Sequence, residues 1–319
     1  MKEILDIPKL SDIQISASVK ISKFKGSFLG LATGDALGLP LENKSPNTFE
    51  PIKDIVGVGI LGLEPGKWTD DTSMALCLAE SLIEKKGFEP IDQLERYLKW
   101  YREGYHSSTG FCFGMGRTTY LALRKFEHTR DAYCGTEDIL FSGNGSIMRL
   151  TPVPMYFSNN FQKAIEMSGE SSKTTHASPL CIDACYLLGS IIVGLLNGFT
   201  KEQVLSENYL KNYWSQNPLN EEIEKIRMGT YKKNNPPYIM GTGYAVKCLE
   251  AALWAFHKTT TFEEGCLSAA NLGHDADTTA AVFGQIAGAY YGYEAIPKKW
   301  ADKIFQHELI ESYAEKLIV

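Results

Sequence analysis

Two short acidic segments, each placed directly before an apolar helix pattern, are the residues in this sequence best suited to chemistry. The first reads WTDDT (68–72) and the second reads GHDADTT (273–279). Aspartate and threonine at a helix start commonly accept hydrogen bonds from free N–H groups, and for the first segment alone such capping is the simpler interpretation. In the second segment, two aspartates and a threonine can direct three oxygens to one point, which suits a hard divalent cation.

The two acidic segments lie about 200 residues apart, so only the packing of their helices can bring them together. Combined, they supply four carboxylates and two hydroxyls, which is a suitable ligand set for one or two Mg²⁺ or Mn²⁺ ions. Paired cations of this kind activate oxygens in hydrolysis. His274 would suggest zinc, but the segment offers no Cys partner and no His-x-x-x-His spacing.

Three further segments each have a structural and a functional interpretation. GDALGLPLE (34–42) is explained by tight helix packing, although Glu42 follows a proline and is free to act as an acid or a base. SGNGSIMR (142–149) is an ordinary glycine-rich turn when taken alone, yet its N–H groups also suit a phosphate. A lone histidine such as His176 is more often structural than functional.

One motif matches a known pattern but lacks the structural context that the pattern requires. GVGILG (57–62) matches the G-x-G-x-x-G pattern of dinucleotide-binding proteins. Pro65-Gly66 intervenes two residues later, so no helix can follow at once, and no alternation of strands and helices surrounds the motif. We therefore exclude a dinucleotide-binding fold.

Composition narrows the class of protein. The chain has 319 residues, 44% of them hydrophobic and 22% charged, which suffices for a full core and excludes disordered, collagen-like or coiled-coil chains. The 38 acidic and 32 basic residues give a net charge of −6. An acidic balance argues against a non-specific nucleic-acid binder.

Cysteine usage and hydropathy predict a cytoplasmic location. The count of seven cysteines is odd and includes no C-x-x-C pair, which indicates reduced thiols. The beginning of the chain lacks the apolar run of a signal peptide. The most apolar stretch, from Ala184 to Leu196, is too short to span a bilayer, so we expect a buried core helix and no membrane partner.

The periodicity of apolar residues predicts a largely helical protein. Residues recur at three- and four-residue spacing in seven ranges: 72–85, 91–101, 118–126, 181–196, 243–256, 262–271 and 278–291. The best candidate for a strand is 52–63. Residues 1–22 are polar and poorly periodic, so we predict an N-terminal extension over 1–22 and one catalytic domain over 23–319. Length alone suggests two domains, but the separated acidic segments must meet in a single unit.

Taken in order, these motifs resemble the ADP-ribosylglycohydrolase family, and in particular its dinitrogenase-reductase-activating branch. The resemblance covers roughly residues 24 to 305. It is carried by GSFLGLATGDALGLPLE (26–42), KWTDDTSMAL (67–76), SSTGFCFGMGRTT (107–119), SGNGSIMRLTPV (142–153), SSKTTHASP (171–179), GTGYAVKCLEAALWAF (241–256) and ANLGHDADTTAAVFGQIAGAYYG (270–292).

The resemblance implies an all-α fold, a compact orthogonal multi-helix bundle with a central cleft for two Mg²⁺ or Mn²⁺ ions. The residues that match the family's metal ligands are Thr69, Asp70, Asp71, Asp275, Asp277 and Thr278. The residues expected to contact the ADP-ribose ligand are Asn144, Gly145, Ser146, His176, Gly110 and Phe111. The candidate catalytic residues are Glu42, Asp71 and Asp275.

The sequence departs from the family pattern at three positions. Similar members often read C-F-D-I-G-N where this chain has CFGMGR (112–117), so Gly114 replaces an aspartate that has been proposed to take part in catalysis, and Arg117 adds charge where asparagine is common. His274 stands where glycine, asparagine or aspartate is usual.

The expected function is hydrolysis of ADP-ribose from modified protein side chains, with arginine as the favoured linkage and serine or O-acyl linkages as alternatives. A second hypothesis is an immunity protein that neutralises an ADP-ribosyltransferase toxin by hydrolysis, or by direct binding through residues 1–22. A third, a catalytically silent relative, is disfavoured because all six metal-ligand positions are filled. We expect a cytoplasmic monomer with no nucleic-acid partner.

Overall fold

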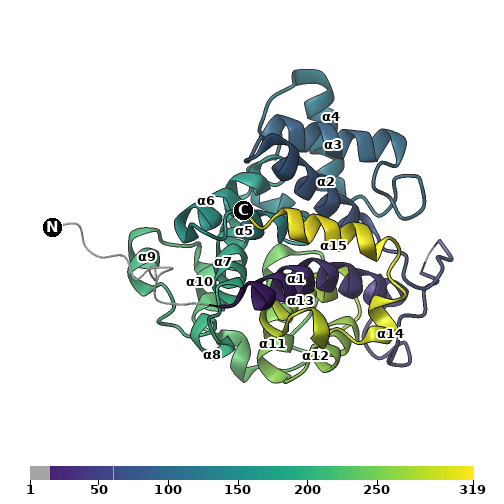
Figure 1. Cartoon of the computed structure of the whole chain (residues 1–319), viewed down its shortest axis with the longest axis vertical. Helices are drawn as coiled ribbons and strands as arrows, with labels where there is room; N and C mark the ends of the chain where they lie inside the picture. Colours follow the sequence, from purple (N-terminus) through teal and green to yellow (C-terminus); the bar gives the residue numbers. More distant parts are fainter. Residues whose placement is uncertain (1–14, 60) are drawn as a thin grey trace.

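The predicted all-α class is confirmed. The computed structural model describes residues 15–59 and 61–319, and within these ranges it contains α- and 3-10 helices, isolated bridges and no β-strand (Figure 1). The seven helices expected from periodicity are all present, with ends within three residues of prediction. They are α2 (Asp70–Lys85), α3 (Pro90–Glu103), α4 (Arg117–Thr129), α7 (Pro179–Leu196), α11 (Ala245–Lys258), α12 (Phe262–Ala270) and α13 (Ala276–Tyr291).

The remaining α-helices are mostly short. They are α1 (Ala17–Gly38), α5 (Pro152–Tyr156), α6 (Phe161–Lys173), α8 (Lys201–Val204), α9 (Lys211–Gln216), α10 (Glu221–Arg227), α14 (Lys298–Ala301) and α15 (His307–Lys316). The expected strand over 52–63 is wrong: glycines at positive φ and Pro65 keep this segment in irregular loop, with one bridge between Val58 and Leu63.

Helix α1 begins earlier than the predicted domain boundary. It starts at Ala17, and Ser16 accepts a hydrogen bond from the N–H of Val19 at 3.3 Å as its cap. Residues 17–22 of the predicted extension therefore form the first turns of α1. Residues 1–14 lie outside the described residues, so a partner-binding role for them stays a prediction.

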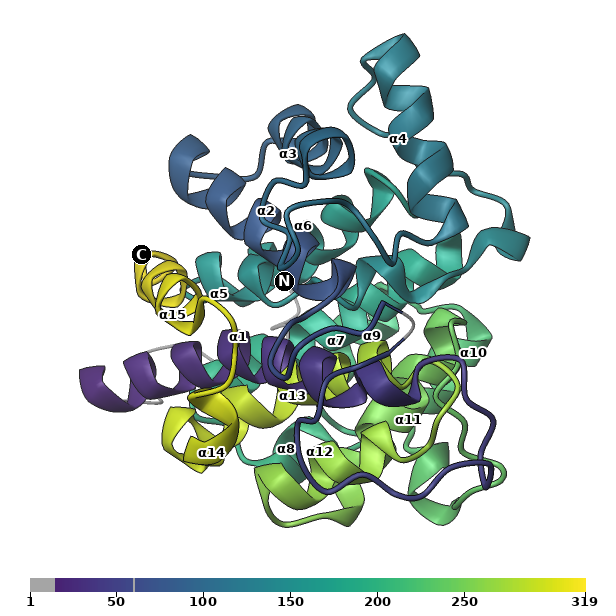
Figure 2. The same ribbon diagram turned by 90° about the vertical axis from the view of Figure 1, so that its right-hand side faces the viewer.

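The axis of the fold is the crossing of α1 and α13, which lie side by side in Figures 1 and 2. Small residues repeat every fourth position on both helices, so that Gly26, Gly30, Gly34 and Gly38 face Gly288, Gly284, Ala280 and Ala276. A Cβ atom at any of these four glycines would overlap backbone atoms of α13. The pairing runs antiparallel, so the end of α1 lies at the start of α13.

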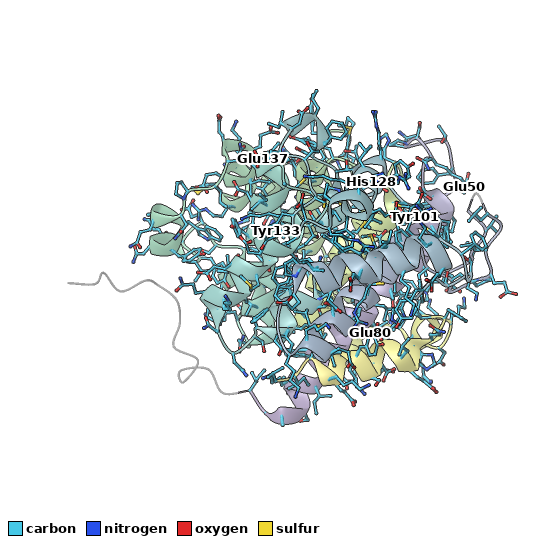
Figure 3. All side chains as sticks on the ribbon, turned by 90° about the horizontal axis from the view of Figure 1, so that it is seen from above. Glu50, Glu80, Tyr101, His128, Tyr133 and Glu137 are labelled. Atoms are coloured by element: carbon cyan, nitrogen blue, oxygen red, sulfur yellow. The ribbon has the colours of Figure 1, made fainter. Side chains whose placement is uncertain are left out.

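Other helices cover this axis on both sides. In Figure 2, α2, α3 and α4 lie above α1 and α13, and α11 and α12 lie below. Helix α7 is apolar and 18 residues long, which by length and composition would allow it to cross a membrane. It is 78% buried inside the protein, as expected for a core helix. Glu80 of α2, labelled in Figure 3, accepts hydrogen bonds from Tyr313 of α15 and from Tyr105, which follows α3.

Candidate active site

Three helix ends converge beside the crossing of α1 and α13. The chain leaves α1 through the 3-10 turn Leu39–Leu41 and reaches Glu42, while α13 begins at Ala276 in the same region. Helix α2 is held there by Asp35, a buried carboxylate of α1. Asp35 accepts hydrogen bonds from the N–H groups of Thr69 at 2.9 Å and Thr72 at 3.1 Å, and from the Thr72 hydroxyl at 2.6 Å. The acidic start of α2 is therefore anchored to α1.

Threonine hydroxyls connect the two acidic segments directly. The hydroxyl of Thr278 on α13 donates to Oδ2 of Asp71 on α2 at 3.4 Å, and the hydroxyl of Thr69 donates to the same oxygen at 3.1 Å. Segments 69–71 and 275–278, about 200 residues apart in the chain, thus form one face. We call the residues Asp70, Asp71, Asp275, Asp277 and Thr278 the acidic wall.

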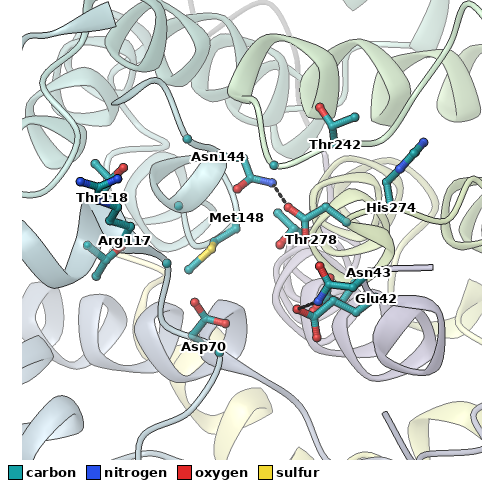
Figure 4. Close-up of a pocket in the computed structure, with 18 of the residues that line it drawn as sticks. Glu42, Asn43, Asp70, Arg117, Thr118, Asn144, Met148, Thr242, His274 and Thr278 are labelled. Atoms are coloured by element: carbon teal, nitrogen blue, oxygen red, sulfur yellow. Dashed lines mark hydrogen bonds between the residues drawn. The ribbon is translucent and has the colours of Figure 1, made fainter. Parts of the chain in front are cut away.

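A glycine-rich loop completes this region. The 3-10 turn Asn144–Ser146 is held by the N–H of Asn144, which donates to the carbonyl of Gly243 at 3.0 Å, and by Gln285 of α13, which donates to the carbonyls of Ile147 and Met148. The Asn144 amide donates to Oδ2 of Asp275 at 2.7 Å, drawn as a dashed line in Figure 4. The loop is therefore tied to the acidic wall.

These elements enclose a cavity of about 530 Å³, a size typical of small-molecule sites. Eight of the residues expected from sequence line it: Glu42, Asp70, Asn144, Gly145, His176, Asp275, Asp277 and Thr278. Thr69, Asp71 and Ser146 lie buried behind its surface. Figure 4 shows Glu42 and Asn43 on one side, with Asp70 across from them.

The structure does not bring Gly110 and Phe111 to this cavity. Both line a separate surface depression together with residues of α3, and the Phe111 side chain is 53% exposed. Their expected contact with ADP-ribose was a consequence of the resemblance alone. The loop that carries them reaches the cavity only further along the chain, at Gly114 and Gly116.

Burial and mutual repulsion disfavour the charged forms of Asp70, Asp71 and Asp277. Burial, followed by the nearby Asp35, raises the pKa of Asp70 to about 8. The pKa values of Asp71 and Asp277 are also raised well above the ordinary range, by burial first and then by neighbouring carboxylates. Asp35 shows a smaller effect: burial raises its pKa to about 6, because its hydrogen bonds favour the charged form.

The donor set fits divalent cations. Oδ1 of Asp71 and Oδ1 of Asp277 are buried and have no hydrogen-bond partner, and buried oxygens of this kind ordinarily have one. Carboxylate and hydroxyl oxygens are the ligands that Mg²⁺ and Mn²⁺ prefer. Within residues 15–59 and 61–319, no three acidic, histidine or cysteine side chains are already gathered in a metal-binding arrangement.

Comparison with known proteins decides the family. The family model described as ADP-ribosylglycohydrolase matches residues 16–319. The chain belongs to the ADP-ribosylglycohydrolase family. It is 40% identical to the ADP-ribosylarginine hydrolase Tri1 of Serratia proteamaculans (strain 568), over 95% of this chain and 81% of that protein. It is 29% identical to the ADP-ribosyl-[dinitrogen reductase] glycohydrolase of Rhodospirillum rubrum, over 88% and 89% of the two chains.

A solved structure titled ADP-ribosylglycohydrolase-related protein complex shares the fold. Its TM-score is 0.84 at 38% identity, with 94% of this chain and 98% of that chain covered. Membership of this family makes the protein a glycohydrolase.

The departures of this glycohydrolase lie on the cavity surface. Gly114 has φ +79°, and a Cβ there would overlap Oδ1 of Asp70. Arg117, the first residue of α4, is exposed and is the one Lys or Arg among the described residues that line the cavity. His274 has φ +55°, a left-handed conformation that glycine, asparagine and aspartate tolerate well, as does histidine more than most residues.

Sequence reasoning missed Asp35. It lies within a long apolar helix, in the GDALGLPLE segment that tight helix packing already explained, so only its charge in a buried stretch marked it as unusual. It also missed Thr242 and Gly243, which line the cavity. The bridge between Gly143 and Tyr244 brings their loop against the glycine-rich loop of the cavity, a contact that the sequence does not indicate.

Proposed function

We propose that this protein releases ADP-ribose from arginine side chains of modified proteins, with two Mg²⁺ or Mn²⁺ ions. The observation that carries the proposal is the meeting of two distant acidic helix starts at one cavity, with two carboxylate oxygens buried and unpaired. The arginine linkage is supported by two relatives named ADP-ribosylarginine hydrolase, which are 40% and 36% identical to this chain.

The acidic wall and Thr69 are the proposed metal ligands. When bound, such cations orient oxygen ligands and lower the pKa of water. They would also offset the repulsion among the buried carboxylates, because opposite charge favours the ionised form.

Asp275 and Glu42 are the proposed proton-transfer residues. Asp275 lines the cavity, whereas Asp71 lies behind it with one oxygen occupied by two threonines, so Asp275 is better placed to accept the proton of the attacking water. The water oxygen bonds to C1″ of the ribose as the bond from C1″ to the guanidine nitrogen breaks. Glu42 is placed to protonate the leaving nitrogen, because it lines the same cavity from the end of α1.

The remaining cavity residues suit the phosphates of ADP-ribose. Asn144, Gly145 and His176 line it with hydrogen-bonding groups, and Arg117 supplies a positive charge that no carboxylate pairs with among the described residues. Guanidinium groups bind phosphate through two parallel hydrogen bonds. A ligand with ribose hydroxyls at one end and phosphates further along would place the hydroxyls at the acidic wall and the phosphates at these groups.

The test is a panel of linkages. Arginine-, serine-, O-acyl- and cysteine-linked ADP-ribosyl substrates are incubated with the purified protein, with and without Mg²⁺ or Mn²⁺, and free ADP-ribose is measured. We expect metal-dependent release from the arginine linkage. Release from another linkage alone, or equal release after chelation, would contradict the proposal.

We propose a cytoplasmic monomer as the working form. All seven cysteines are unpaired, which supports a reducing compartment. Neutralisation of a toxin through the predicted extension, residues 1–22, remains a separate hypothesis. It is tested by deleting residues 1–14, which precede α1, and measuring affinity for an ADP-ribosyltransferase.

A further inference from the structure

A buried chain of hydrogen bonds ends at His176, the histidine that lines the cavity. Nη2 of Arg149 donates to Oγ1 of Thr175 at 2.7 Å, and the same Oγ1 lies 2.8 Å from Nδ1 of His176. All three side chains are at most 2% exposed. No function described so far uses Arg149 or Thr175.

The surroundings of Arg149 are unusual for a buried cation. Within the described residues it has no carboxylate partner; its guanidinium lies over the ring of Tyr97 at 4.6 Å and its Nη1 faces the sulfur of Met74 at 3.7 Å. A fully buried charge ordinarily pairs with an opposite charge. The one strong acceptor that Arg149 contacts is therefore the Thr175 hydroxyl.

The chemistry of Arg149, Thr175 and His176 determines which atom donates and which accepts in each of the two hydrogen bonds. A guanidinium only donates, so Oγ1 of Thr175 accepts from Arg149 and its own hydrogen needs an acceptor. Nδ1 of His176 is the other atom within hydrogen-bond distance of this hydroxyl among the described residues. If Nδ1 carried a proton, the buried hydroxyl hydrogen would be left unpaired, which costs free energy. Nδ1 is therefore the acceptor.

The same environment keeps the ring neutral, and two hydrogen bonds hold the backbone of His176 in place. Burial, and then the charge of Arg149, lower the pKa of His176 to about 3. The N–H of His176 donates to the carbonyl of Ser172 at 2.7 Å, and the Ser172 hydroxyl donates to the carbonyl of His176 at 2.7 Å. A neutral imidazole whose Nδ1 accepts must carry its proton on Nε2.

Nε2 faces the glycine-rich loop of the cavity. A Cβ at Gly145 would lie 2.9 Å from it, and a Cβ at Gly143 would lie 3.6 Å from it. No described residue accepts a hydrogen bond from Nε2, although His176 lines the cavity. The absence of side chains at 143 and 145 leaves this donor accessible to a ligand.

We propose that Arg149 and Thr175 are positioning residues that fix His176 as the Nε2–H tautomer, so that it offers a neutral hydrogen-bond donor to an oxygen of ADP-ribose. The identity of the ligand rests on the proposed function, whereas the tautomer does not. A neutral donor suits this place because a protonated histidine would repel cations held at the acidic wall.

The tautomer is tested by long-range ¹H–¹⁵N spectra of the full chain labelled at histidine nitrogens. The His176 signals are assigned by their loss in His176→Gln. We expect a protonated Nε2 and an unprotonated Nδ1 in the wild type. Thr175→Val, which removes the hydroxyl and keeps the shape, is expected to give a mixture of tautomers, and Thr175→Ser is expected to restore one.

Binding of free ADP-ribose in the presence of Mg²⁺ gives the second readout. Thr175→Val is expected to weaken it about two- to fourfold, because only the fraction of molecules with a protonated Nε2 can donate, and Thr175→Ser should recover most of the affinity. Thr174→Val is the matched control, because the buried Thr174 hydroxyl contacts Gln93 and Ser171 instead of the histidine. It should leave tautomer and affinity unchanged.

A protonated Nδ1 in the wild type, or an unchanged tautomer in Thr175→Val, overturns the proposal. A mixed tautomer with unchanged ADP-ribose affinity also overturns it, because the donor would then have no use in binding. The proposed function fails differently: the wild type would show the fixed tautomer yet release no ADP-ribose from the arginine-linked substrate.

Discussion

The cavity has two walls of opposite character. Four of the five residues of the acidic wall are buried and Asp275 is half-buried. The wall comes from the starts of α2 and α13, which Asp35 and the crossing with α1 hold in place. The opposite wall consists of Gly114, Gly116, Arg117 and Thr118, most of it exposed, on a loop and the first turn of α4.

The two walls differ also in how closely they follow the family. The acidic wall has every expected metal-ligand residue type, whereas two of the three departures, Gly114 and Arg117, lie on the opposite wall. A buried, cross-connected surface tolerates little change, and an exposed loop tolerates more. We infer that the acidic wall carries the reaction and that the opposite wall adjusts which substrates are accepted.

The largest effect is expected from the acidic wall. Groups that merely orient a metal ligand commonly contribute roughly 10- to 100-fold to activity, so losing a direct ligand in Asp70→Ala or Asp277→Ala should lower kcat/KM by at least about 100-fold. Release of ADP-ribose measures this. Asp302→Ala, which removes an exposed carboxylate paired with Lys298, is the matched control. Near-normal activity in both site variants would remove the acidic wall from the mechanism.

The next largest effect is expected from Asp35, whose hydrogen bonds hold the acidic wall in place. Asp35→Ala leaves the N–H groups of Thr69 and Thr72 without their buried acceptor, so we expect a loss of about 2–3 kcal/mol in the free energy of unfolding. Asp35→Asn retains one acceptor oxygen and should lose less. Urea unfolding measures both. A change below about 0.5 kcal/mol in Asp35→Ala would mean that water replaces the carboxylate.

A smaller effect is expected at Gly114, the residue of the opposite wall that lies against Asp70. Gly114→Ala adds a Cβ at positive φ and against Asp70, which should cost about 1–2 kcal/mol and displace that ligand. Gly114→Asp introduces the aspartate that the family resemblance leads one to expect, but it adds a negative charge at the same place, so activity should fall further. Higher activity in Gly114→Asp would show that the loop adapts. Gly116→Ala, where nothing lies within 4 Å and φ is −67°, is the control.

The smallest effect is expected from the opposite wall itself. Arg117→Ala removes one exposed charge, so KM should rise by a factor of about three to ten while kcat changes little. Arg117→Lys retains the charge but lacks the planar guanidinium with its paired donors, so its KM should be intermediate. The effect should weaken with added salt. A fall in kcat with unchanged KM would place Arg117 in the reaction and erase the distinction between the walls.

The sequence predicted the helices well and the connections between them poorly. Apolar periodicity located α2, α7 and α13 because each buries a continuous face or its whole surface. The acidic wall was predictable because its residues carry local spacing. Asp35, and the contact of Arg149 with Thr175, were not, because each depends on a partner at least 26 residues away. Gly110 and Phe111 were misplaced because a family motif says little about where a loop bends.

The crossing of α1 and α13 has a consequence for how the protein is made. Its two helices lie far apart in the sequence, and the proposed metal ligands of α2 have no counterpart until α13, which ends at Tyr291, has been synthesised. Contacts at such sequence separation form late, because closing a long loop must precede them. A ribosome-bound chain ending before α13 therefore holds its aspartates without their counterparts, and the glycohydrolase cannot become competent before α13 has been synthesised.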